Sequence, residues 1–321
     1  MHADIMTPRT RIFISAIIVA VFNFSPSAHA TLNWYQHLFS TLSPTQKSAS
    51  SSNIFRHSEI SDRCLLASQV KNAETSKYRI HGWRWHRLSA ARDLDRLSDL
   101  AGSFHFDSSS FDNVGNDPLL VATKFVVDVN LAGLHEVETK VFVPFLRKYI
   151  CEAKSIGDYQ FQKAFGRMLD RWFEKDENGW KSWKDIGTNM KRHAKIASAS
   201  SSTSQERYRS AQELSRLSSH LSRCLRSNYS ASSSLIIPVV AAYIPNRQEK
   251  FNNDVISILG VLSSRVFLVG MHDTASEEGE ESLFKESIPN LARIMIPRWK
   301  EKVWGPLGGT TLYGNLSISR K

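Results

Sequence analysis

Long segments of this chain place apolar residues three and four positions apart, with few glycines or prolines to interrupt them. In the segment 78–101, one helical face collects His86, Ala90, Leu94, Leu97 and Ala101. This spacing is the period of an amphipathic α-helix. With 15 Gly and 10 Pro in 321 residues, the chain lacks the turn signals that a many-stranded β-protein needs roughly every 8–12 residues. The pattern therefore predicts an all-α fold.

The same periodicity predicts further helices. They cover residues 118–149, 158–175, 205–227, 255–271 and 280–303, and an apolar stretch lies at 235–244. A Ser/Ala run at 197–204 is typical of a linker, and a second Ser run lies at 230–234. We expect a four-helix bundle with extra helices over 76–305, a polar insertion at 151–204, and a C-terminal tail at 306–321.

Residues 1–30 have the layout of a secretory signal peptide. Arg9 and Arg11 precede an apolar run at 12–22, and small residues lead to a cut after Ala30. The run is short for a bilayer span, which takes about 20 apolar residues, and no later segment reaches that length. We expect cleavage, with an uncleaved anchor as the alternative. The Ser/Thr-rich segment 31–75 is expected to be a flexible lead-in.

Cleavage would lower the net charge from +10 to +9, because two Arg and one Asp leave with the leader. The product is then expected in the secretory pathway or outside the cell, with a plastid reached through a signal-peptide route as the alternative. An oxidising compartment permits one disulfide among Cys64, Cys151 and Cys224, whose pairing stays open. Asn228 and Asn315 begin sequons for glycosylation there.

The helix predicted at 118–149 carries two polar side chains on its apolar inner stripe. The stripe reads Leu120, Val127, Leu131, His135, Glu138, Phe142 and Phe145. His135 and Glu138 share one face because they are three residues apart. A buried carboxylate is costly unless it is paired or bound to metal, and imidazole with carboxylate suits iron, manganese or zinc. The pair is a candidate metal site. The alternative is an ion pair between Glu138 and an inward arginine, with His135 hydrogen-bonded to Glu138.

Two further histidines continue inner stripes. His86 occupies the inner face of the first helix, and His272 follows Val269 by three residues on a later one. We take both as candidate metal ligands. For His86, the alternative is a core histidine that is hydrogen-bonded to a neighbour.

These residues resemble the hemerythrin-like (HHE cation-binding) family. Residues 134–144, Leu-His-Glu-Val-Glu-Thr-Lys-Val-Phe-Val-Pro, are similar to that family's second-helix motif, and residues 82–86, Gly-Trp-Arg-Trp-His, to its first helix. The resemblance covers roughly residues 78–305. It implies a four-helix bundle around a two-iron centre that binds oxygen or senses iron or oxygen. Its ligands here would be His86, His135, Glu138 and His272.

The ligand set of that family is incomplete in this chain. The family usually has four residues between the His and Glu of the second helix, and its third helix supplies further histidines, where this chain offers only His220. Two hypotheses follow. One is a hemerythrin-like protein that binds one or two metal ions. The other is a metal-free helical interaction protein whose inner His and Glu form a buried polar network with Arg265 or Arg92.

Other functional classes lack their motifs. The chain has no His-Glu-x-x-His, no Gly-rich phosphate loop and no Gly-x-Ser-x-Gly elbow, so we assign no catalytic residue. A protein without enzymatic activity is favoured, and the oxidation of a substrate at bound iron is the alternative. The positive charge is diffuse, which argues against a nucleic-acid partner. Its densest cluster, 293–302 with Trp299 and Trp304, is typical of a solvated helix end, with contact to anionic lipid or polyanion as the alternative.

Overall fold

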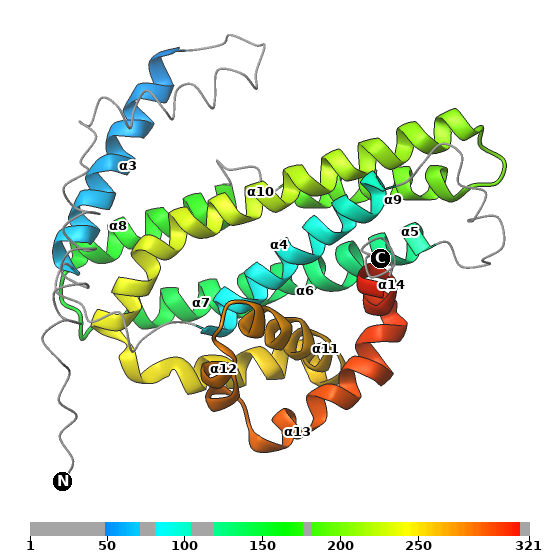
Figure 1. Cartoon of the computed structure of the whole chain (residues 1–321). Helices are drawn as coiled ribbons and strands as arrows, with labels where there is room; N and C mark the ends of the chain where they lie inside the picture. Colours follow the sequence, from blue (N-terminus) through cyan, green and yellow to red (C-terminus); the bar gives the residue numbers. More distant parts are fainter. Residues whose placement is uncertain (1–48, 71–80, 104–117, 176–181, 315–321) are drawn as a thin grey trace, which may run out of the picture. The chain divides into compact units, whose positions relative to one another are not determined.

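Helices make up the regular structure of the described residues, and no strand occurs among them (Figure 1). The computed structural model describes residues 49–70, 81–103, 118–175 and 182–314. The predicted all-α fold class is confirmed. The predicted leader at 1–30 lies outside the described residues.

The chain divides into two units. Of the first, Met1–His57, the structure describes only the start of helix α3 (Ala49–Gln69). The second unit, Ser58–Lys321, contains all the other described helices.

In the second unit, the last turns of α3 contribute to the core. Leu66 and Val70 are buried there, and Asp62 accepts a hydrogen bond of 2.9 Å from Arg167 Nε. The sequence placed these turns in a flexible lead-in at 31–75. The part at 58–70 is helical instead, because Asp62, Leu66 and Val70 repeat every four residues among polar neighbours.

Helix α4 (His81–Gly102) packs along α10 (Ser204–Tyr243) and α11 (Gln248–Glu277) (Figure 1). A second helical run, Pro118–Cys151, also contacts α4 and alternates between α and π geometry. Its segments are α5 (Pro118–Lys124), η3 (Phe125–Leu131), α6 (Ala132–Val137), η4 (Glu138–Phe142), α7 (Val143–Leu146) and η5 (Arg147–Cys151). The helices predicted at 78–101 and 118–149 are thus present.

The run Pro118–Cys151 is, among the described helices, the one long and apolar enough to cross a membrane. The sequence pattern had assigned that length to no segment after the leader. Within the fold, 56 % of its most apolar window is buried, and Val127, Leu131 and Phe142 lie in the protein core. This burial is consistent with a core helix and with the expected lack of a stable membrane span.

Both serine runs differ from a long linker such as the one predicted at 197–204. Residues 230–234 lie inside α10, where the Ser232 hydroxyl donates to the Asn228 carbonyl oxygen at 2.8 Å. Such bonds let serine continue a helix that its neighbours stabilise. In the run 197–204, the first residues end α9 and the next form a turn up to Thr203. Thr203 is the N-cap of α10, and it forms a capping box with Glu206.

Residues 151–204, predicted as a polar insertion, supply three helical segments to the core. They are α8 (Tyr159–Leu169), η6 (Asp170–Lys175) and α9 (Trp183–Ser198). The buried side chains of α8 are Phe161, Ala164, Phe165, Met168 and Leu169. α9 packs on α10 and α5. It escaped prediction because its buried stripe consists of Trp183, Met190 and small residues between lysines and arginines.

The helices after α11 are short. After α11, which follows η7 (Pro245–Arg247), come α12 (Glu281–Ser287), α13 (Asn290–Trp299), η8 (Lys300–Gly309) and α14 (Thr310–Gly314). The single helix predicted at 280–303 is broken at Ile288, which is extended before Pro289 because a residue before proline disfavours the helical conformation.

Part of the predicted C-terminal tail belongs to the core. Residues 306–314 belong to η8 and α14, with Gly308 as a non-helical break, and Leu312 is fully buried. Gly308, at φ 130°, lies against Phe125, where a Cβ atom would come within 3.2 Å of the ring carbon Cγ. A glycine is therefore required where the chain folds back. Residues 315–321 lie outside the described residues.

The start of α4 lies between two apolar clusters. Trp83 stacks on Phe142 with ring centroids 4.4 Å apart, in a cluster with α8 and the end of α10. Trp85 contacts Phe284 in the other cluster, which includes α9 and α13. Residues two apart on a helix point in nearly opposite directions, so α4 joins the two clusters.

Candidate functional site

Glu138, the predicted carboxylate ligand, is held by two side chains of α4. Trp83 Nε1 donates to Glu138 Oε1 at 3.0 Å, and Arg87 Nε donates to the same oxygen. Trp83 and Arg87 are four residues apart, so α4 presents both on one face. The carboxylate is therefore neutralised by a guanidinium inside the protein.

Arg87 extends this contact to a third helix. Its Nη1 donates to Asn228 Oδ1 of α10 at 2.6 Å, and its guanidinium lies 5.2 Å from the Trp83 ring. Asn228 Nδ2 donates in turn to the Trp172 carbonyl oxygen at 3.2 Å. We call Trp83, Arg87, Glu138 and Asn228 the interior polar network. It joins α4, η4 and α10 through bonds that are buried and charge-balanced.

The predicted ligand His86 lies on another side of α4. Its ring packs on Phe267 of α11 with centroids 4.5 Å apart, and its Nε2 has no hydrogen-bond partner in the described structure. Burial, aided by the nearby charge of Arg87, lowers the pKa of His86 to about 3. The imidazole is therefore neutral at physiological pH.

The other two predicted histidines contact different helices. His135 is half-buried against Trp183 of α9, with ring centroids 5.4 Å apart, and burial together with Lys184 lowers its pKa. His272 lies 3.4 Å from Asp273 and 3.7 Å from Glu281. Both carboxylates already pair with lysines, Asp273 with Lys300 at 2.7 Å and Glu281 with Lys285 at 2.6 Å.

These side chains do not fit an iron, zinc or manganese site. Among the described residues, no group of three or more His, Cys, Asp or Glu side chains is placed to hold a metal ion. Glu138 is bound to Arg87, and a second cation beside that guanidinium would be repelled. His86, His135 and His272 each pack against a separate aromatic ring.

A second buried polar cluster was not predicted in the sequence analysis. Asp93 of α4 is fully buried and accepts hydrogen bonds from Asn130 Nδ2 and from Tyr313 Oη. Arg92 lies 3.7 Å from the same carboxylate. Burial raises the pKa of Asp93 to about 6, although Arg92 and the Tyr313 hydrogen bond oppose the shift. Its position on the inner face, one turn before Leu97, was the available clue.

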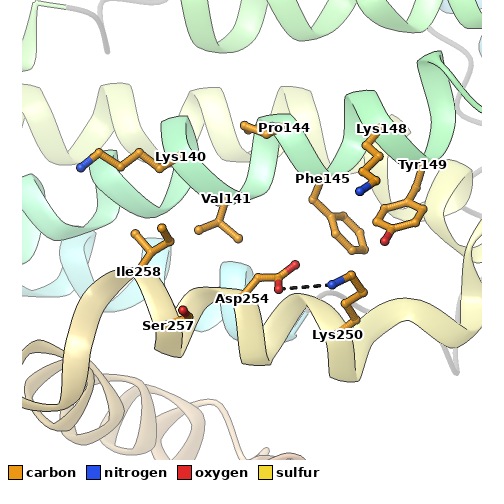
Figure 2. Close-up of a pocket in the computed structure, with 10 residues that line it drawn as sticks. All are labelled: Lys140, Val141, Pro144, Phe145, Lys148, Tyr149, Lys250, Asp254, Ser257 and Ile258. Atoms are coloured by element: carbon orange, nitrogen blue, oxygen red, sulfur yellow. Dashed lines mark hydrogen bonds and ion pairs between the residues drawn. The ribbon is translucent and has the colours of Figure 1, made fainter.

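The described structure also has an open groove between the run Pro118–Cys151 and the first half of α11. It has a volume of about 280 Å³, and Figure 2 shows its two walls. The lining residues are Lys140, Val141, Pro144, Phe145, Lys148, Tyr149, Lys250, Asp254, Ser257 and Ile258. Its floor is apolar and its rim carries three lysines.

The groove exposes an aliphatic side chain of the helix predicted at 255–271. Ile258 is 44 % exposed. Gly260, at φ 70°, interrupts the helical conformation of α11 two residues later. Because of this break, the residues before Gly260 do not share the helical face of Val266 and Val269, which are buried.

The three cysteines are free in the structure, and Asn228, which begins a predicted sequon, is fully buried. The second sequon begins at Asn315, which lies outside the described residues. Comparisons of the chain with protein-family models, with curated proteins and with solved structures find no match.

Proposed function

We propose that this chain is a metal-free helical interaction protein of the secretory pathway, and that the groove binds an acidic amphipathic helix of a partner. One observation carries the proposal. Lys140, Pro144 and Lys148 recur every four residues on one wall, and Lys250, Asp254 and Ile258 do so on the other. A third helix that lies along both walls meets this repeat at every turn.

The charge of the groove favours an acidic partner. Its rim carries three lysines and one carboxylate, Asp254. Lys250 Nζ lies 3.4 Å from Asp254, and Lys140 Nζ lies 2.5 Å from the exposed Glu136 one turn before it. Exposed ion pairs of this kind contribute little to stability, so the lysines remain able to bind the carboxylates of a partner. Val141 and Phe145 would receive the apolar side chains of such a helix.

In this proposal, α4, the run Pro118–Cys151, α10 and α11 are the four helices of a hemerythrin-like bundle. The interior polar network then takes the place of metal ligands on the inner stripes. The alternative hypothesis of an iron protein has less support, because Glu138 is already paired with Arg87.

Two measurements test the two parts of the proposal. Elemental analysis of protein purified without chelator should find no stoichiometric iron, zinc or manganese, and a chelator should leave the melting temperature unchanged. Stoichiometric metal together with a chelator-sensitive melt would contradict the metal-free part.

Peptide binding tests the groove. The probe is a synthetic amphipathic helix with a leucine face flanked by glutamates, and its control has lysines in place of the glutamates. We expect fluorescence anisotropy to detect binding of the acidic peptide only, weakened about tenfold by Lys148→Glu with Lys250→Glu. Lys195→Glu, an exposed charge reversal on α9, should have little effect. Equal binding of both peptides would overturn the proposal.

A further inference from the structure

Two aliphatic side chains protrude from α13. Leu291 is 72 % exposed and Ile294 is 75 % exposed. They are three residues apart and lie on the same face of the helix. Two exposed cations extend this surface, Arg298 on α13 and Lys302 at the start of the π-helical segment η8 that follows. We call Leu291, Ile294, Arg298 and Lys302 the α13 face.

The segment that carries these two side chains is rich in positive charge. Residues 290–302 include Arg293, Arg298, Lys300 and Lys302 and one carboxylate, Glu301. Lys300 is paired with Asp273 at 2.7 Å. Lys302 lies 2.6 Å from Glu301, and the two side chains are 66 % and 69 % exposed. An ion pair this exposed contributes little to stability. A surface of dense negative charge would therefore compete with Glu301 for Lys302.

We propose that the α13 face docks this protein on an anionic phospholipid membrane. Protein interfaces concentrate aromatic residues and exclude charge from their centre, whereas this face has exposed aliphatic side chains next to cations and no aromatic residue. A lipid surface matches both components. The aliphatic side chains enter the boundary between headgroups and acyl chains, and the cations meet phosphate groups.

This docking is peripheral and does not depend on the groove. The α13 face carries two aliphatic anchors and two cations, which together give weak, reversible binding. It also gives the basic cluster at 293–302 a role. Trp299 and Trp304 of that cluster contact Arg265 and Phe125 within the protein, so they contribute to packing and not to the α13 face.

Hydrogen exchange of the full chain, read peptide by peptide by mass spectrometry, tests the proposal. The probes are vesicles of phosphatidylcholine alone and of phosphatidylcholine mixed with phosphatidylserine. We expect the mixed vesicles alone to protect residues 288–302, and salt to reduce this protection. Because the signal is local, the apolar residues 12–22 do not contribute to it.

Variants separate lipid docking from other causes. Leu291→Ser with Ile294→Ser should raise the lipid concentration for half-maximal protection at least about tenfold, and Arg298→Ser with Lys302→Ser several-fold. Tyr159→Ser, at an exposed site on α8, should change nothing. Unchanged protection in the Leu291/Ile294 variant would overturn the proposal. Protection that appears with protein concentration in the absence of lipid would assign the α13 face to a second copy and also overturn it.

Discussion

Arg87 and Glu138 form an ion pair from which solvent is excluded, with side-chain exposures of 0 % and 1 %. Desolvation of two charges is expensive, and their mutual attraction offsets it only while both partners are present. Asn228 and Trp83 supply further hydrogen bonds to the pair. The pair therefore makes the packing of α4, η4 and α10 interdependent.

Removal of one partner should destabilise the fold more than removal of both. We expect Arg87→Met or Glu138→Met to lower the free energy of unfolding by about 3–5 kcal/mol, because each leaves a buried charge unpaired. The double variant, with two apolar side chains of similar length, should recover much of that loss. Urea unfolding of the four proteins measures this coupling.

An exposed pair on α10 provides the control. Arg216 Nη2 lies 2.6 Å from Glu213 Oε1, and both side chains are well exposed. The same substitutions there should change stability by less than about 1 kcal/mol. A double variant of Arg87 and Glu138 that is as unstable as the sum of its singles would contradict the account.

The sequence identified Glu138 as a buried carboxylate but not its partner. Helical periodicity places a residue on an inner face, and an ion pair with an inward arginine was one of the two expectations. That arginine is Arg87 and not Arg92 or Arg265. Arg92 instead lies beside Asp93, and the Arg265 guanidinium lies 5.8 Å from the Trp299 ring. The choice depends on which helices pack together, which local spacing does not specify.

Fold class was predictable because each helix carries its own period. Contacts between distant segments were not, and this explains the missed tail. Leu312 and Tyr313 are the apolar part of a short segment rich in Gly and Thr, and they join the core through Trp304 and Asp93. The groove escaped prediction for the same reason, since its walls come from residues about 110 positions apart.

Asn228 should carry no glycan in the folded protein. Its side chain is fully buried and bonded to Arg87 and to the Trp172 carbonyl, so the sequon at 228–230 has no accessible acceptor nitrogen. We expect peptide mass spectrometry of protein expressed in a secretory host to find Asn228 unmodified. A folded fraction with a glycan at this site would show that α10 is not packed as described.

Gly133 should resist substitution because it touches Phe267. A Cβ atom there would lie 2.8 Å from the ring carbons Cε1 and Cε2 and still closer to Cζ. The ring is buried and packs on His86, so it has little room to move. We expect Gly133→Ala to cost about 1–3 kcal/mol in thermal or urea unfolding.

Gly166 on α8 is the matched control for that substitution. A Cβ atom there would meet Cys151 Sγ at 3.8 Å, an ordinary contact. Gly166→Ala should therefore be neutral or stabilise the helix by up to about 1 kcal/mol. Equal effects of the two alanine substitutions would show that the contact with Phe267 does not limit position 133.

Asp93 should make the folded protein less stable as pH rises. A carboxylate in a surface ion pair has the opposite effect, because its pKa is lowered in the folded protein. The pKa of Asp93 is raised to about 6 by burial, against the opposing effects of Arg92 and the Tyr313 hydrogen bond, and Asp273 adds to the rise. The folded protein thus holds a proton between pH 4 and 6 that the unfolded chain has released. As pH rises through this window, Asp93 lowers the free energy of unfolding, by about 2 kcal/mol between pH 4 and 7.

Asp93→Asn removes this titration while it keeps an acceptor for Tyr313. We therefore expect the stability of the wild type, measured by urea unfolding relative to Asp93→Asn, to fall from pH 4 to 6 and to level off above. Asp95→Asn changes an exposed carboxylate of α4 that pairs with Arg226 at 2.6 Å, and it should leave the slope in place. The contrary outcome is that the free energies of unfolding of wild type and Asp93→Asn change in parallel across this range. Asp93 would then be ionised throughout, because its contact with Arg92 outweighs the cost of burial.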